Sequence, residues 1–496
     1  MRGFLQAVFV IVVLASTGVR TPADDAQSLL AKNKAFAGWV FGDPSMDGLR
    51  LTGHAGKRQI VDLRRGAIWK RSFTDDKTGV SRDIGYTGKL FWSTNGNGFT
   101  VPVLADGVKY EIAYQVLMNQ GIPLLSGKPR ANSLVEGVQT QVVRVEPPGA
   151  FPIDAYIDPQ SGKLLRAVID PDGSKTTIDV LGYTDLGGKK IISKWRVDDN
   201  VFEFTKSEHA TISDEAFHPP ARRAVWDFAP PQPMPITVSR DRISLRASFN
   251  GVEGNFIFDS GAAGITVNAD FGDRAKLKIL EASKSYGLNG ETNTSIARAD
   301  TIKIGGNVLH NVIVGVGTNA HGRWEDYDGL IGFDFLAGAI VDIDVNKQQM
   351  TIFDPAKYSV NATGPALPLD LRRGWATVPV TLDGRVKAHL SFDTGDPMSV
   401  FVTDKLYGGS HGVQIRFVGY ARMGGAGGDS QKYASCGRMQ SLEIGTISYG
   451  DVPVCFGESK VLFGNDEGII GLDFIKHFDL TFDYPDGLLY LTPLKK

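Results

Sequence analysis

Two aspartates occupy the same short motif at two places in this chain: Asp259 in Asp259-Ser260-Gly261 and Asp393 in Asp393-Thr394-Gly395. Each motif follows a segment typical of a buried strand. A carboxyl group can accept or donate a proton, and two carboxyls that lie close together can share one proton and so supply a base and an acid at one site. Such a triplet arises by chance in roughly one chain of this size in every few. The second copy is therefore what makes the motif informative.

The surroundings of the two motifs repeat as well. The first is followed after 73 residues by the glycine of Leu330-Ile331-Gly332, and the second after 78 residues by that of Ile469-Ile470-Gly471. Val341–Asp344 and Leu480–Asp483 then form a further matching pair. A unit that repeats at about 135 to 140 residues is longer than a solenoid repeat and indicates a duplicated domain.

Composition indicates a mostly β protein of several domains. A chain of 496 residues can form two to four domains with their own cores. Its 58 glycines exceed the usual share of about 7% and, with alternating β-branched residues, favour strands and tight turns. The formal charge of −2 provides no long-range attraction to nucleic acid. We therefore expect no nucleic-acid partner.

The first 23 residues are typical of a signal peptide. Arg2 precedes an apolar run from Phe4 to Ala15, and small residues follow. The run is too short to span a membrane, so we expect no integral membrane span. No cysteine stands near the cleavage region, as a bacterial lipid anchor would require. The mature chain is expected to be exported, to the periplasm or beyond the cell.

Residues 24–228 are predicted to form a β-rich N-terminal domain. Asp24-Asp25 can cap a helix that ends at Gly38, and strand-length runs with turns, such as Asn95–Gly98 and Asp158–Gly162, follow as far as Trp226. These turns predict hairpins rather than crossovers. The segments 156–166 and 182–188 loosely resemble the half-barrel of outer-membrane lipoprotein carriers and their lipid-binding relatives. The resemblance implies a half-barrel-like domain.

A proline-dense stretch, residues 229–235, is predicted to be a linker. Pro230, Pro231, Pro233 and Pro235 exclude helix and the interior of a sheet. We expect few contacts to cross this boundary, so that a chain beginning near Gln232 folds and keeps its activity. A milder break between Asp354-Pro355 and Pro368 separates lobe 1, residues 236–355, from lobe 2, residues 366–494.

Residues 236–494, roughly half of the chain, resemble two retropepsin-like aspartic peptidase lobes in one chain, close to bacterial aspartyl protease families and arranged as in pepsin. The resemblance implies a duplicated pair of β-barrels with one aspartate each at a shared cleft. Asp259 and Asp393 would activate water to hydrolyse a peptide bond in a peptide or protein substrate. Because both aspartates belong to one chain, we expect a catalytic monomer.

The resemblance also assigns supporting roles. Ser260 and Thr394 would hydrogen-bond across the lobes, while Gly261 and Gly395 would let the two loops approach without side-chain clash. Asp334 and Asp473 would be structural. A flap over the substrate is expected at Tyr286 in the segment Tyr286–Gly290, and a second at Tyr420, ahead of Gly424–Gly428; ordinary hairpin turns are the alternative.

One departure leaves the function open. Asp396 stands where the family usually has a small residue after Asp-Thr-Gly. It either adds negative charge beside the two aspartates, which would raise their pKa, or accepts hydrogen bonds within its own turn. The alternative to an aspartic endopeptidase is a non-catalytic periplasmic protein that keeps the fold and binds peptide or lipid.

Other chemistry is less well supported. The eight histidines show no metal-binding spacing, so no metal or other cofactor is expected.

Cys436 and Cys455, the two cysteines of the chain, lie on segments predicted to be neighbouring strands. In an oxidising compartment they are predicted to form a disulfide that stabilises the fold by about 3 kcal/mol. Two separate buried thiols are the alternative.

Overall fold

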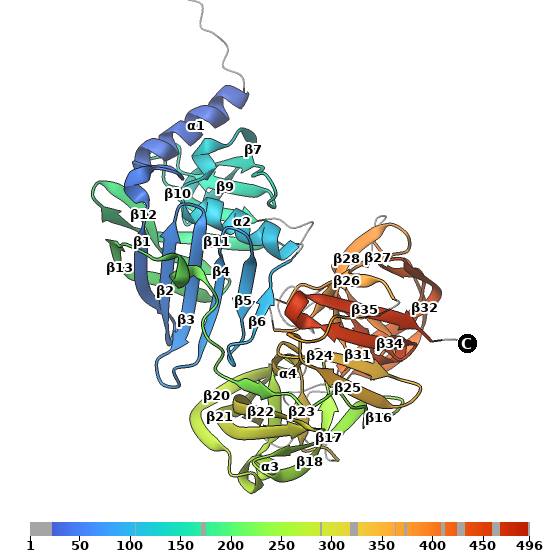
Figure 1. Cartoon of the computed structure of the whole chain (residues 1–496). Coiled ribbons are helices and arrows are strands. Elements are labelled where there is room, and N and C mark those ends of the chain that lie inside the picture. The colour runs from blue at the N-terminus through green and yellow to red at the C-terminus, as the bar shows by residue number, and fades with distance from the viewer. Residues whose placement is uncertain are drawn as a thin grey trace, which may run out of the picture.

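The computed structural model (Figure 1) describes residues 22–494, apart from 105, 170–174, 288–289, 318–325, 363, 372–373, 408–411, 424–431 and 459–466. The fold is mostly β, with 55% strand and 12% helix, which confirms the predicted class. Nearly all of the predicted signal peptide lies outside the described residues. None of the helices within the described ranges combines the length and the apolar character needed to cross a membrane.

One antiparallel sheet of thirteen strands builds the N-terminal part, coloured blue to green in Figure 1. Its strands are β1 (Leu49–Ala55), β2 (Arg58–Arg65), β3 (Ile68–Asp75), β4 (Ser81–Tyr86), β5 (Phe91–Thr94), β6 (Thr100–Pro102), β7 (Gly127–Val135), β8 (Val138–Val145), β9 (Ile153–Ile157), β10 (Leu164–Ile169), β11 (Thr176–Leu186), β12 (Lys189–Val197) and β13 (Asn200–His209). Their order is β6-β5-β4-β3-β2-β1-β13-β12-β11-β10-β9-β8-β7. Neighbours are thus consecutive strands, as the hairpin prediction requires, except where β1 pairs with β13.

Two helices pack against this sheet, α1 (Pro22–Ala37) and α2 (Asp106–Met118). Leu30 of α1 and Leu117 of α2 belong to one buried cluster with the sheet residue Trp195. The first helix is the one predicted, and it ends at Ala37, just before Gly38, which has a φ of 76°. The second lies where strands were expected. Its buried face includes Gly107 and Glu111, so its apolar periodicity in the sequence is weak.

Lobe 1 is a nine-stranded sheet that begins with a strand from before the proline-rich stretch. Its strands are β14 (Val225–Asp227), β16 (Thr237–Val238), β17 (Ile243–Phe249), β18 (Val252–Phe258), β19 (Ile265–Asn268), β20 (Lys278–Gly287), β21 (Gly290–Ile304), β22 (Asn307–Gly317) and β23 (Gly329–Ile331). The order is β14-β22-β19-β23-β18-β17-β21-β20, with β16 beside β17. Strand β23 runs parallel to β18 and antiparallel to β19.

Lobe 2 repeats this arrangement with seven strands. They are β27 (Thr377–Leu382), β28 (Val386–Asp393), β29 (Val400–Thr403), β30 (Ile415–Met423), β31 (Lys432–Ile444), β32 (Ile447–Gly457) and β33 (Gly468–Gly471), in the order β27-β28-β33-β29-β32-β31-β30. Strand β33 runs parallel to β28 and antiparallel to β29, as β23 does to β18 and β19. The predicted duplication is therefore present in the topology and not only in the motifs.

A six-stranded sheet joins the two lobes. It consists of β15 (Met234–Pro235), β24 (Ile340–Asp344), β25 (Gln349–Phe353), β26 (Ala366–Pro368), β34 (Phe478–Asp483) and β35 (Leu488–Pro493). Its order is β15-β25-β24-β34-β35-β26, so β24 of lobe 1 pairs directly with β34 of lobe 2. The remaining short helices are α3 (Ala269–Arg274), α4 (Phe333–Leu336), α5 (Leu472–Ile475) and 3₁₀ turns at Pro44–Met46, Ile122–Leu124, Asp214–Phe217 and Tyr484–Asp486.

The expectation that few contacts cross the proline-rich stretch is wrong. Strand β14 pairs with β22 of lobe 1, and Trp226 is buried in the core of the lobes. Met234 and Pro235, inside the predicted linker, form β15 at the edge of the joining sheet. An edge strand tolerates proline because its outer N–H groups have no partner in the ladder. Proline therefore excluded the sheet interior, as predicted, but not the sheet.

The N-terminal part also contacts both lobes directly. Asn97, in the turn between β5 and β6, donates from Nδ2 to the carbonyl of Ile313 at 3.0 Å and accepts the Ile313 N–H at 2.7 Å. Phe99 is fully buried in the same core as Trp226. Asp106 at the start of α2 lies 3.0 Å from Nε2 of His389 on β28. Local proline spacing could not reveal these contacts, because they depend on how the hairpin docks.

Candidate active site

Each aspartate stands at the end of a central strand, beside the parallel strand of its lobe. The Asp259 N–H donates to the carbonyl of Ile331 at 3.0 Å. A Cβ on Gly332 would lie 2.7 Å from the Asp259 carbonyl oxygen, and one on Gly471 would lie 2.8 Å from that of Asp396. The glycine of each apolar motif is therefore required because the backbone passes directly against the loop that carries the aspartate.

Ser260 and Thr394 link the two loops through matching hydrogen bonds. The Ser260 N–H donates to Thr394 Oγ1 at 3.0 Å, and the Thr394 N–H donates to Ser260 Oγ at 3.0 Å. Each hydroxyl donates in turn to the strand of the other lobe: Ser260 Oγ to the Phe392 carbonyl at 2.7 Å and Thr394 Oγ1 to the Phe258 carbonyl at 2.9 Å. Both residues are fully buried. This network holds the two loops in one fixed relation.

Gly261 and Gly395 bring the two carboxyl groups together. A Cβ on Gly261 would lie 2.3 Å from Cγ of Asp393, and one on Gly395 would lie 2.5 Å from Cγ of Asp259. No other residue type fits at such distances. Each glycine N–H also donates to the carboxylate of its own loop, Gly261 to Asp259 Oδ1 at 3.0 Å and Gly395 to Asp393 Oδ1 at 2.8 Å.

The environment of the pair favours retention of a proton. Burial raises the pKa of Asp259 well above its usual range, and the neighbouring charge of Asp393 raises it further. Burial also raises the pKa of Asp393, against hydrogen bonds that lower it. Two carboxyls in contact cannot both ionise easily, so one proton is shared by the pair. This arrangement provides a general base and a general acid at one point.

Arg242, immediately before β17, belongs to the same site and was not predicted. Its side chain is buried, with 5% of the residue exposed, and Nη1 donates to the Gly395 carbonyl at 3.4 Å. Its positive charge lowers the pKa of Asp393. A single arginine before an apolar strand carries no signal in the sequence, since its position depends on the packing of the two lobes.

The two acids of the apolar motifs differ from each other. Asp334 accepts a hydrogen bond from Asn95 Nδ2 of the N-terminal sheet at 2.8 Å, and burial raises its pKa to about 6. Asp473 pairs with Lys476 at 2.6 Å, and its side chain is 43% exposed. Both side chains thus make polar contacts with residues outside the pair of aspartates, Asn95 and Lys476, as a structural role requires.

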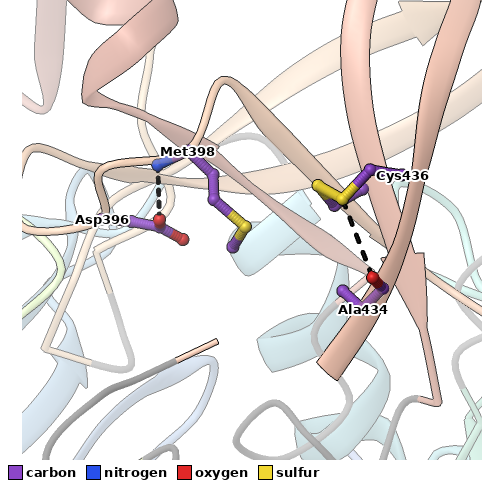
Figure 2. The surroundings of a disulfide bond; sticks show 5 residues. Asp396, Met398, Ala434 and Cys436 are labelled. Carbon is purple, nitrogen blue, oxygen red and sulfur yellow. Dashed lines mark hydrogen bonds between the residues drawn. A yellow bond between two sulfur atoms is a disulfide. The ribbon is translucent and has the colours of Figure 1, made fainter. Parts of the chain in front are cut away.

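Asp396 accepts a hydrogen bond within its own turn. Its Oδ1 receives the N–H of Met398 at 2.8 Å (Figure 2), and its own N–H donates to Asp393 Oδ1 at 3.2 Å. Aspartate commonly caps a turn in this way. The second of the two interpretations from the sequence, a turn-capping aspartate, is the one that this geometry supports.

The disulfide between Cys436 and Cys455 is present in the structure (Figure 2). The two cysteines are directly opposite each other on β31 and β32. They pack against Met398, Phe401 and Ala434 in a small cluster of lobe 2. The bond therefore ties together the two strands behind the turn that carries Asp396.

The expected flaps are hairpins in the structure. Tyr286 lies near the end of β20 and pairs with Glu291 of β21, while Leu288 and Asn289 at the tip lie outside the described residues. Tyr420 lies on β30 with 76% of its surface exposed, and Gly424–Gly428 are likewise outside the described ranges. Both lobes thus have a long pair of antiparallel strands in the same topological position.

Within the described residues, no group of three or more His, Cys, Asp or Glu side chains could hold a metal ion. The two carboxyl groups themselves can supply acid–base chemistry.

Comparisons with known proteins agree with this geometry in lobe 1. The profile of the family described as "Aspartyl protease" matches residues 245–335, which include Asp259 but end before lobe 2. A search of curated proteins finds no match. Among solved structures, the aspartic proteinase from Irpex lacteus is similar with a TM-score of 0.35 and 12% identity, over 54% of this chain and 98% of the other. Residues 245–335 of the chain are thus aspartyl protease-like.

Proposed function

We propose that this protein is an aspartic endopeptidase in which Asp259 and Asp393 activate a water molecule and hydrolyse a peptide bond. The observation that carries the proposal is the contact between each glycine and the carboxyl group of the opposite lobe. Nothing in the packing of a simple binding module requires two buried carboxyls to share a proton, since burial of such a pair lowers stability.

The two carboxyls have distinct environments, which suggests distinct roles. Asp393 accepts hydrogen bonds from the N–H groups of Gly395 and Asp396, and Arg242 beside its loop lowers its pKa further. Asp259 is therefore the better site for the shared proton. Before the reaction Asp259 would hold the shared proton. In the first step Asp393 would accept a proton from the attacking water while Asp259 protonates the carbonyl oxygen of the substrate. Asp393, now protonated, then gives this proton to the leaving amine as the C–N bond breaks, and Asp259 takes back a proton from a hydroxyl of the tetrahedral intermediate.

The alternative, a non-catalytic binding protein, makes the opposite prediction in the same experiment. The purified mature chain is incubated with an unfolded protein from pH 3 to pH 8, beside the single variants Asp259→Asn and Asp393→Asn. We expect the parent chain and Asp473→Asn, which changes an exposed acid outside the site, to produce fragments. The variants Asp259→Asn and Asp393→Asn should produce none. No cleavage by any chain across this range would contradict the peptidase proposal.

We also propose that the peptidase is exported and acts as a monomer. The apolar run at the start of the sequence and the disulfide in lobe 2 support export to an oxidising compartment. Both aspartates come from one chain, so specific activity should not fall on dilution through the nanomolar range. A steep fall would indicate an obligate dimer. Fractionation of cells that express the full chain tests the location.

A further inference from the structure

A cavity of about 230 Å³ lies where the N-terminal sheet meets both lobes. The sheet contributes Arg82 and Asn95 to its wall, lobe 1 contributes Ala263 and Phe333, and lobe 2 contributes Leu371 and Gly374. Three parts of the chain that are far apart in sequence thus form one enclosure. Its volume is below that of a typical pocket for a whole small-molecule ligand and suits a single amino-acid side chain.

The cavity adjoins the catalytic loops. Ala263 is exposed and stands two residues after Gly261, whose Cα lies against the carboxyl of Asp393. The N–H of Phe333 donates to the Ala262 carbonyl at 3.0 Å, so the cavity wall is fastened to the same loop. A Cβ on Gly374 would lie 3.4 Å from Cβ of Ala263. A group bound here would therefore lie against the loop that carries Asp259.

The wall of the cavity carries one cation, Arg82, and one acid, Asp83. Arg82 is exposed on β4, and its positive charge acts on the buried carboxyl of Asp334, whose pKa it lowers. The acid next to it, Asp83, accepts a hydrogen bond from Ser81 Oγ at 3.1 Å and interacts electrostatically with Arg223. Arg82 is therefore available to a ligand, while Phe333 and Leu371 offer apolar surface for the rest of the bound group.

We propose that this cavity is a specificity subsite in which Arg82 binds a carboxylate of the substrate. The inference rests on the proposed peptidase function and gives the N-terminal sheet a role in it: the sheet closes one end of the binding region and selects substrates. The carboxylate can come from a glutamate or aspartate side chain or from the free C-terminus of a peptide. Both sources present the same planar, two-oxygen acceptor to the guanidinium.

The test uses the full chain and peptides of equal length in which a single glutamate is moved position by position, each matched by a glutamine peptide. The same set is made with an amidated and with a free C-terminus, which separates the two sources of carboxylate. We expect kcat/KM to favour the carboxylate at one position, by about tenfold or more for a charge-assisted hydrogen bond. Arg82→Gln should abolish the preference, and Arg82→Glu should favour a lysine peptide instead.

Arg58→Gln is the matched control. Arg58 on β2 lies close enough to interact with Arg82 electrostatically but does not line the cavity, so this variant should keep the preference. In the opposite outcome, the parent chain cleaves all peptides with the same kcat/KM, whether they carry glutamate or glutamine and whether the C-terminus is free or amidated. That result would overturn the inference and leave the peptidase proposal intact.

A binding measurement tests the subsite even if the peptidase proposal fails. Fluorescence anisotropy with the Asp259→Asn chain reports on the subsite without cleavage. Tighter binding of the glutamate peptide, lost on adding Arg82→Gln, would support the subsite even if the parent chain cleaves nothing and the peptidase proposal fails. Equal affinity for glutamate and glutamine peptides at all positions would refute the subsite by a second route.

Discussion

Replacing Asp334 with asparagine should stabilise the protein at neutral pH and have little effect in acid. Burial raises the pKa of Asp334 from 3.8 to about 6, even though Arg82 acts to lower it. Below pH 4 the carboxyl is protonated in both the folded and the unfolded chain. As the pH rises from 4 to 6 the unfolded chain releases the proton first, so the folded state loses stability across this range. Above pH 6 the loss is complete.

The size of the effect follows from the same pKa values. Each pKa unit corresponds to about 1.36 kcal/mol, so a rise from 3.8 to about 6 is worth up to about 3 kcal/mol. Asp334 keeps some solvent exposure, so we expect about 2 to 3 kcal/mol. Asparagine retains an oxygen that can accept the 2.8 Å hydrogen bond from Asn95 Nδ2, so the substitution removes the charge and preserves the contact.

The assay is urea unfolding followed by tryptophan fluorescence at pH 4 and at pH 7.5. The free energy of unfolding of Asp334→Asn, relative to the parent, should rise by about 2 to 3 kcal/mol between the two values. Asp473→Asn is the control, because that side chain occupies the equivalent position of lobe 2 but is 43% exposed. A difference that is the same at both pH values, or that falls with pH, would refute the reasoning.

Three further predictions test the site and its support. Thr394→Val removes the acceptor of the Ser260 N–H and the donor to the Phe258 carbonyl, so it should lower the free energy of unfolding by about 2 to 4 kcal/mol in the same assay; an unchanged value would show that the network is dispensable. Asp396→Ala should cost about 1 kcal/mol of stability by removing the cap of its turn and leave the alkaline limb of the pH–activity profile in place; a limb displaced to lower pH would instead support an electrostatic role. A chain that begins at Gln232 should be insoluble or unfolded, because it lacks Phe99 and Trp226 of the shared core; a folded, active fragment recovered by gel filtration would contradict the integral role of the N-terminal sheet.

Much of the fold could be predicted because its signals are local. Glycine-rich turns between strand-length runs predict hairpins, and the thirteen-stranded sheet is built from them. The duplicated motifs predict two similar lobes, since the glycines at 261, 332, 395 and 471 are needed wherever backbone meets backbone or carboxyl at close range. Helix α2 was not predicted because Glu111 on its buried face interrupts the apolar pattern.

What the sequence by itself determined is which residues are equipped for acid–base chemistry: Asp259 and Asp393, each with its hydroxyl and its glycine. Residue type and spacing suffice for that, because the same local backbone is built twice. Only the tertiary structure decided the surroundings of the pair. Three features join segments more than 100 residues apart. They are the hydrogen bond from Arg242 to the Gly395 carbonyl, the hydrogen bond from Asn95 to Asp334 and the cavity that Arg82 lines. Such contacts arise from the docking of separate sheets, and a linear pattern of residues does not record how sheets dock.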